Sequence, residues 1–310
     1  MRAMPTMVSR VRWALNLLWK TIEKFFVDGC PSMAAALSFY AFFSLPALLS
    51  LLLLLVGTLV DPRDVERAIT TQVQQLIGRG GADQVRTILA HVRQTYIDTS
   101  VAAVLGAVAL FLGATTAFAQ LQDALNRVWN VKPDPTSNQI RNFIIKRVFS
   151  FGVVLALAFL LLVSLGVSAA LAAFGELVIA RLGASGVLLL IANWVVSLVV
   201  ITGIFAVMFK LLPDADIAWR DVWVGAVGTA LLFGLGRGVI GYYLGQTDPG
   251  SAYGAAGSLA VVIIWVYYSS MIVLFGAEFT RAWTDRVRGG AKPEPGAVEV
   301  VEEEIAVQRG

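Results

Sequence analysis

Six stretches of this sequence are each long and apolar enough to cross a membrane as a helix. A bilayer core about 30 Å thick requires roughly 20 apolar residues of helix. The stretches show no alternation of apolar and polar residues, which excludes the strands of a membrane barrel. We therefore predict an all-α, polytopic membrane protein with transmembrane helices over residues 35–60, 101–119, 148–174, 186–209, 219–244 and 256–279.

The composition supports this class. Hydrophobic residues make up 57% of the 310 residues, and charged residues make up only 15%, against roughly 25% in soluble globular proteins. A soluble domain of this size has too little interior for so much apolar surface, so a cytosolic enzyme and a disordered chain are excluded. Cys30 and His91 are the single cysteine and the single histidine. We therefore predict no disulfide framework, no metal site and no cofactor.

The positive charges predict the orientation. With six spans, 17 Lys and Arg residues fall on the side of the termini, and six fall on the opposite side. Basic residues accumulate on the cytoplasmic side of membrane proteins. We therefore expect both termini to lie in the cytoplasm.

Three regions follow from this arrangement. Residues 1–34 form a basic, amphipathic N-terminal segment, and residues 35–288 form the transmembrane domain. Residues 289–310 are rich in Gly, Pro and Glu, and we expect a disordered acidic tail there. The first external loop, residues 61–100, has apolar residues at helical spacing on both sides of a glycine-rich break, which predicts an amphipathic helical hairpin. The sequence leaves open whether this hairpin caps the bundle or lies on the lipid.

Arg237 is one of two charged residues that we place inside the spans. A charge at this depth costs roughly 2.5–3.5 kcal/mol, so such residues are candidates for function. We expect Arg237 to point into the bundle or along its seam and to hold an anionic group such as a lipid phosphate. The alternative is an arginine that snorkels to the outer headgroups. A stripe of glycines beside it predicts close approach of a neighbouring helix: Gly234, Gly238, Gly241 and Gly245.

Glu278 is the second intramembrane charge, at the cytoplasmic end of the last span. It is close in sequence to Arg281 and in expected depth to Lys210. One interpretation is an interfacial ion pair among these residues. The sharper hypothesis is a gate or a proton-linked carboxylate.

Other polar residues could form a seam through the bundle. Pro46 lies inside the first span and should kink its helix, because proline removes one backbone hydrogen bond. The spacing of the remaining candidates along the sequence leaves open whether their side chains meet. With Arg237, the predicted lipid-binding set is Ser38, Tyr40, Asn193 and Tyr242.

Several short motifs together resemble the YihY/BrkB family of bacterial inner-membrane proteins. They are Ala34–Tyr40, Ser44–Pro46, Leu125–Trp129, Leu212-Pro213 with Ala218–Asp221, and Tyr253–Ser258 followed by Gly276–Phe279. The resemblance covers residues 22–286. It implies a multi-pass protein of the inner membrane with six helices and cytoplasmic termini. The family that it resembles has been named both as a virulence factor and as ribonuclease BN, and some of its members have been linked to the handling of envelope lipids.

The residues argue against the ribonuclease and against any enzyme. Phosphodiester hydrolysis needs a metal cluster or an acid–base pair near solvent, and we find neither. Two hypotheses remain. The first is a transporter or lipid-handling protein for an anionic amphiphile. The second is a non-transporting scaffold that organises the envelope. The expected partners are anionic membrane lipids and no nucleic acid, and a homo-oligomer is compatible with the sequence.

Overall fold

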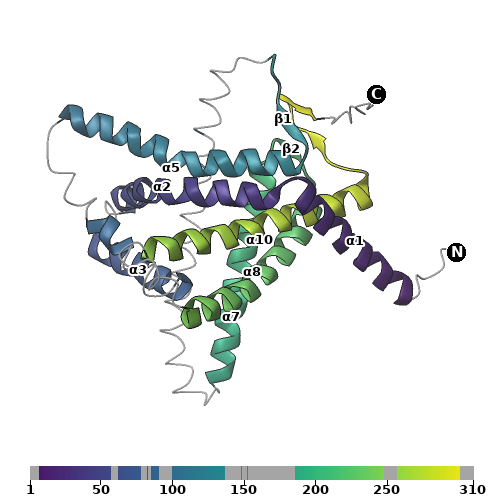
Figure 1. Cartoon of the computed structure of the whole chain (residues 1–310), viewed down its shortest axis with the longest axis horizontal. Helices are drawn as coiled ribbons and strands as arrows, with labels where there is room; N and C mark the ends of the chain where they lie inside the picture. Colours follow the sequence, from purple (N-terminus) through teal and green to yellow (C-terminus); the bar gives the residue numbers. More distant parts are fainter. Residues whose placement is uncertain are drawn as a thin grey trace, which may run out of the picture.

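The computed structural model describes residues 7–56, 62–77, 82, 85–90, 100–136, 148, 152, 186–247 and 257–300. Its main helices are α1 (Met7–Val27), α2 (Cys30–Val56), α3 (Pro62–Ile77), α5 (Ser100–Val128), α7 (Gly186–Leu211), α8 (Trp219–Thr247) and α10 (Gly257–Arg288). The predominance of helix confirms the predicted class. Figure 1 shows the long helices gathered into one bundle, with α3 at one end and both termini at the other.

Four helices in the described part of the chain are long and apolar enough to span a membrane. The qualifying stretches are Cys30–Leu49, Trp194–Leu211, Trp219–Ile240 and Leu259–Arg288. The predicted stretch at 101–119 lies within α5, and the stretch at 148–174 lies outside the described residues apart from two positions. These four candidate spans support a multi-pass membrane protein, whereas the number six and the orientation stay predictions.

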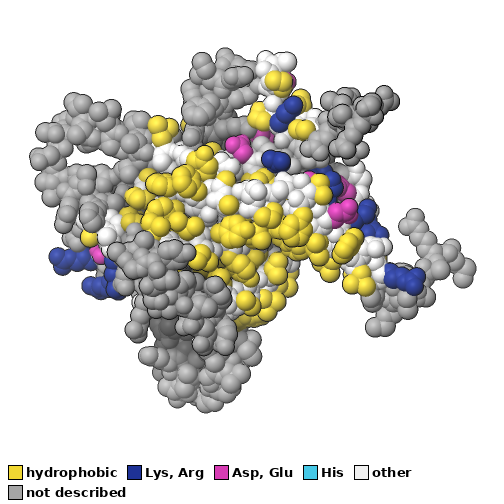
Figure 2. Space-filling view, viewed as in Figure 1, with side chains coloured by type: hydrophobic (Ala, Val, Ile, Leu, Met, Phe, Trp, Pro, Cys, Tyr) yellow, Lys and Arg dark blue, Asp and Glu magenta, His cyan; other side chains and the backbone are white. Residues whose placement is uncertain are grey.

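The core of the bundle lies where α5, α7, α8 and α10 meet α2. Its largest fully buried side chains include Leu125, Phe209, Val222 and Leu274. Large apolar side chains on the outer faces of the same helices are exposed, among them Trp194, Leu235 and Val239. Figure 2 shows this apolar surface as a broad band across the bundle, with charged side chains at both ends. An exposed apolar band of this kind fits a lipid environment.

Helices α8 and α10 approach each other closely through two glycines. A Cβ added at Gly225 would overlap the Thr280 hydroxyl, and one added at Gly276 would overlap the Thr229 hydroxyl. Each hydroxyl donates to a carbonyl of its own helix: Thr229 to Gly225 (2.7 Å) and Thr280 to Gly276 (2.6 Å). The polar threonines are thus satisfied inside the apolar bundle.

The glycines that form this contact are not those of the glycine stripe predicted from the sequence. A Cβ at Gly234 or Gly238 would meet nothing within 4 Å, so the prediction of close packing is wrong at both positions. The surroundings of Gly241 and Gly245 lie outside what the structure describes. A four-residue glycine spacing does not by itself determine which face meets a neighbouring helix, and here the buried glycine of this segment is Gly236.

Short strands connect the C-terminal segment to the ends of α5 and α7. Strand β1 (Val131–Pro133) pairs antiparallel with β4 (Ala297–Glu299), and β2 (Ala215–Asp216) pairs with β3 (Lys292–Pro293). The prediction of a disordered tail is therefore wrong for residues 292–299, because their backbone groups find partners in the two interhelical loops. Residues 301–310 lie outside the described part.

Candidate functional site

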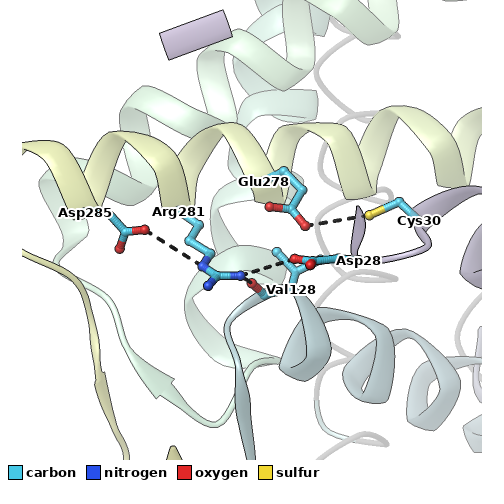
Figure 3. Close-up of polar contacts among 6 residues, drawn as sticks. All are labelled: Asp28, Cys30, Val128, Glu278, Arg281 and Asp285. Carbon is cyan, nitrogen blue, oxygen red and sulfur yellow. Dashed lines mark hydrogen bonds and ion pairs between the residues drawn. The ribbon is translucent and has the colours of Figure 1, made fainter. Parts of the chain in front are cut away.

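A cluster of ionisable side chains is buried where the last turns of α10 meet the beginning of α2. Glu278 lies on α10, and its side chain is only 1% exposed. The Cys30 thiol at the start of α2 donates to its Oε1 atom over 3.7 Å (Figure 3). Asp28, in the turn between α1 and α2, lies close to Glu278 (Figure 3). Residues 28, 30 and 278 thus form one polar group inside apolar surroundings.

Arg281 is the cation of this cluster. It lies one turn after Glu278 on α10, and its Nη1 atom is 3.3 Å from the Asp28 carboxylate. The same atom donates to the Val128 carbonyl at the end of α5, and Nε is 3.9 Å from Asp285 (Figure 3). One guanidinium therefore joins α10 to the α1–α2 turn and to α5. These groups meet because the end of α1, the beginning of α2 and the end of α5 converge beside α10.

The hypothesis of an ion pair among Glu278, Arg281 and Lys210 is only partly met. Among the described residues, Arg281 forms ion pairs with Asp28 and Asp285. Lys210 donates to Asp216 (3.0 Å) and to the Ile217 carbonyl (2.8 Å) in its own loop. Lys210 and Asp216 are only six positions apart in the chain. The short α7–α8 loop therefore brings the lysine to a partner within the loop.

A second group of polar contacts, made of side-chain hydrogen bonds, joins the α7–α8 loop to α5. Gln122 and Asn126, both on α5, donate to the two carboxylate oxygens of Asp214 (3.1 and 2.8 Å). The Asp214 backbone N–H donates back to the Asn126 side-chain oxygen over 2.7 Å. Sequence analysis missed this contact, although Asn126 and Asp214 each belong to or border a motif on which the family resemblance rests.

The predicted lipid-binding residues are not brought together. Ser38 is buried, and its hydroxyl donates to Ala35 in the same helix over 2.8 Å. Tyr40 and Arg237 are both exposed among the described residues, and the predicted role of Arg237 in holding an anionic group stays a prediction. Helix α2 continues through Pro46 to Val56. The side chains of Asn193 and Tyr242 lie outside the described residues.

An open basic cavity lies on α3, the first arm of the predicted hairpin. It has a volume of about 310 Å³ and is lined by Arg63, Glu66, Arg67, Thr70, Thr71 and Arg86. Helix α3 packs against α2, α8 and α10. Figure 1 shows it at the end of the bundle opposite the strands. The ionisable cluster and the basic cavity therefore belong to opposite ends of the bundle.

A metal centre has no support in the described part of the chain. There, no group of three or more His, Cys, Asp and Glu side chains has an arrangement that could hold a metal ion.

The fold, the apolar outer band and the several candidate spans define a multi-pass helical membrane protein. Within that class, the family described as Virulence factor BrkB matches residues 21–299. The chain belongs to this family. No solved structure matches the chain.

Similar curated proteins carry the name UPF0761 membrane protein. One from Alkalilimnicola ehrlichii is 28% identical over 89% of this chain and 60% of its own length. Others come from Alcanivorax borkumensis, 25% identical over 84% of this chain and 58% of its own, and from Ralstonia nicotianae, 25% identical over 81% and 54%. The chain thus spans about three-fifths of the length of the relatives it matches. Their names state a membrane protein and no activity.

Proposed function

We propose that this chain is a bacterial inner-membrane protein, with both termini in the cytoplasm, that binds and moves an anionic amphiphile such as an envelope lipid. The observation that carries the proposal is the basic cavity of α3 at one end of an apolar bundle. Three arginines and two threonines line it, against one glutamate. The role proposed is not enzymatic.

The chemistry of the cavity fits a phosphate or carboxylate headgroup. Guanidinium groups present planar pairs of donors that match these anions, and charge-assisted hydrogen bonds are the stronger kind. A volume of about 310 Å³ is at the small end of ligand pockets. It suits a headgroup, while acyl chains would lie against the exposed apolar faces of the neighbouring helices.

Arg237 supports the same proposal from the outer face of α8. It is exposed between Leu235 and Val239, which are 73% and 65% exposed. An arginine on an apolar, lipid-facing surface reaches toward headgroups along its aliphatic stem. Since α8 runs toward the end of the bundle that carries α3, Arg237 adds a cation on the route to the cavity.

The scaffold remains the second candidate, and one observation favours it. Ser38 donates to its own helix, and Tyr40 and Arg237 face outward. The predicted polar seam is therefore not assembled among these residues. A scaffold would present the basic cavity and the strand-tied end of the bundle to partners and would move no lipid.

Lipid binding and lipid movement are measured separately to distinguish these functions. The purified protein is reconstituted in vesicles of phosphatidylethanolamine and phosphatidylglycerol that contain fluorescent analogues of both. Retained lipid is quantified by mass spectrometry. The variant R63Q/R67Q/R86Q removes the cationic lining, and R127Q is the matched control, since Arg127 is exposed at the other end of the bundle.

We expect the triple variant to lose retained phosphatidylglycerol and its transbilayer movement, and R127Q to keep both. Arg237→Gln should lower retention further than Arg237→Lys, which keeps the charge. Equal anionic lipid in wild type and all variants would contradict the binding site. Binding without movement above empty vesicles, with or without a proton or ion gradient, would support the scaffold.

A further inference from the structure

Helix α1 leaves the bundle obliquely at the strand-tied end (Figure 1), and one of its faces packs against α10. Trp13 meets Trp283 edge-to-face with ring centroids 5.4 Å apart, and Phe25 meets Phe275 edge-to-face over 5.7 Å. The Arg286 guanidinium lies 5.5 Å from the centre of the Trp13 ring. These contacts fix the rotation of α1 about its own axis, so its other faces have defined directions.

The second face of α1 is apolar and exposed. Its side chains recur at the i, i+3, i+4, i+7 and i+11 spacing of one helical stripe, and each is between 41% and 68% exposed. They are Leu15, Leu18, Trp19, Ile22 and Phe26. In Figure 2 the hydrophobic band of the bundle continues toward this helix. The stripe therefore extends the lipid-facing surface of the bundle onto α1.

The third face of α1 is polar and mainly basic. Arg12, Lys20 and Lys24 are exposed on it, and among its described residues Glu23 is the one acid. A helix with an apolar stripe beside a basic face is typical of helices that lie in the plane of a membrane surface. Basic residues at this level attract anionic headgroups. The charge of α1 therefore complements an anionic membrane.

Exposed tryptophans on a second helix indicate the same level. Trp219 and Trp223, in the first turns of α8, are 50% and 48% exposed. Strand β2 precedes α8 and pairs with β3, which follows α10. Helix α8 therefore begins at the end of the bundle where α1 contacts α10. Because tryptophan gathers at membrane–water interfaces, these residues together with Trp19 of α1 indicate the headgroup level.

We propose that α1 is an interfacial helix that binds the anionic membrane surface at the strand-tied end of the bundle. Its apolar stripe enters the lipid, and its basic face lies at the phospholipid headgroups. This inference goes beyond the proposed lipid movement and does not depend on it, because the basic cavity lies on α3 at the opposite end. The experiment therefore observes α1 itself and measures neither retained nor moved lipid.

Fluorescence quenching on the full chain in nanodiscs of phosphatidylcholine and phosphatidylglycerol tests the placement. A small thiol-reactive fluorophore is attached to Leu15→Cys on the apolar stripe. Asn16→Cys is the matched control, because Asn16 is the next residue and is exposed on the polar face. Cys30 is buried, and the unsubstituted chain, treated in parallel, measures its background.

We expect a nitroxide on the lipid acyl chains to quench the label at Leu15→Cys, and a water-soluble nitroxide to quench the label at Asn16→Cys. Quenching of the Leu15→Cys label mainly by the water-soluble nitroxide would place the stripe in water. Quenching by neither nitroxide would show that protein covers the stripe, such as a second copy of the chain. Either result would overturn the proposal.

The preference for anionic lipid is measured with the same label. The nitroxide is carried either by phosphatidylglycerol or by phosphatidylcholine, at equal mole fraction in the same mixture. We expect the phosphatidylglycerol probe to quench the Leu15→Cys label more strongly, and R12Q/K20Q to abolish the difference. Glu23→Gln, on the same face, removes an acid and should keep it. Equal quenching by the two probes, or a preference unchanged in R12Q/K20Q, would contradict an anionic partner.

Discussion

At the scale of single residues, the contact between α8 and α10 depends on two glycines. We expect Gly225→Ala and Gly276→Ala each to destabilise the protein by about 1–3 kcal/mol, as overpacking does in a filled core. The added methyl group would overlap Thr280 or Thr229, whose hydroxyls are fixed on backbone carbonyls. Thermal unfolding followed by size-exclusion chromatography in detergent would show a lower midpoint.

Gly234→Ala is the matched control on the same helix. A Cβ there meets nothing within 4 Å, and alanine favours helix by up to about 1 kcal/mol over glycine. This variant should therefore be neutral or slightly stabilising. If Gly234→Ala were the damaging change and Gly225→Ala were tolerated, the glycine stripe predicted from sequence would be the true packing face.

Glu278 shows how far single residues can be interpreted from sequence. A lone carboxyl in an apolar stretch is costly, so its importance could be predicted. Its partners could not, because Cys30 is 248 positions away in the chain and Asp28 lies in a turn outside any apolar stretch. Arg237 shows the opposite case. Its place beside the glycines of α8 predicted an orientation into the bundle or along its seam, whereas its side chain is exposed among the described residues. The face that a helix buries is determined by its neighbours.

At the scale of elements, the apolar stretches predicted most helix positions well. Helices α7 (Gly186–Leu211) and α10 (Gly257–Arg288) begin within one residue of the predicted spans. The four strands were missed because each has only two or three residues and carries no periodicity. Their pairing joins residues far apart in the chain, such as Val131 and Glu299, and the composition of the segment gave no sign of it.

The C-terminal strands should stabilise the end of the bundle. We expect a chain that ends at Gly290 to unfold several degrees below the full-length protein, because β1 and β2 lose their partners. A chain that ends at Val300 keeps both strands and the 2.7 Å bond from Val300 N–H to the Asn130 carbonyl, and it should unfold like the full-length protein. Equal midpoints for the two truncations would contradict a stabilising role.

Glu294, between β3 and β4, gives this segment a pH dependence. Burial raises its pKa above the ordinary value of 4.5; Lys210 acts in the opposite direction, and Asp214 and Asp216 add to the increase. The folded state therefore binds the Glu294 proton more tightly than the unfolded state, and stability falls as the pH rises from 4.5 through the raised pKa.

Glu294→Gln removes this dependence. The variant should be slightly more stable than wild type at pH values above the raised pKa. Because Glu294 is largely solvated, the gain is small, and it should disappear below pH 4.5, where the wild-type side chain is protonated in both states. Unfolding midpoints across this range would measure the difference. A gain that grows toward acid pH would contradict the assigned direction.

At the scale of the whole molecule, the two ends of the bundle differ in construction. One end is tied by the strands, by Asn126 with Asp214 and by Arg281 with Asp28. The other carries α3 and its basic cavity. The proposed function requires this construction, with a binding site at one end of the bundle and helices that stay joined at the other.

This arrangement makes the orientation testable with the chain's own chemistry. Both termini lie at the strand-tied end (Figure 1), and the positive-inside rule predicts that this end faces the cytoplasm. Cys30 is buried at 0% exposure, so it should react little with a maleimide and leave a low background. We expect Arg67→Cys on α3 to react with a membrane-impermeant maleimide in intact cells. Arg127→Cys at the other end should react only after the membrane is opened. The reverse labelling pattern would show the opposite orientation in the membrane. The basic cavity and its proposed anionic ligand would then lie on the cytoplasmic face.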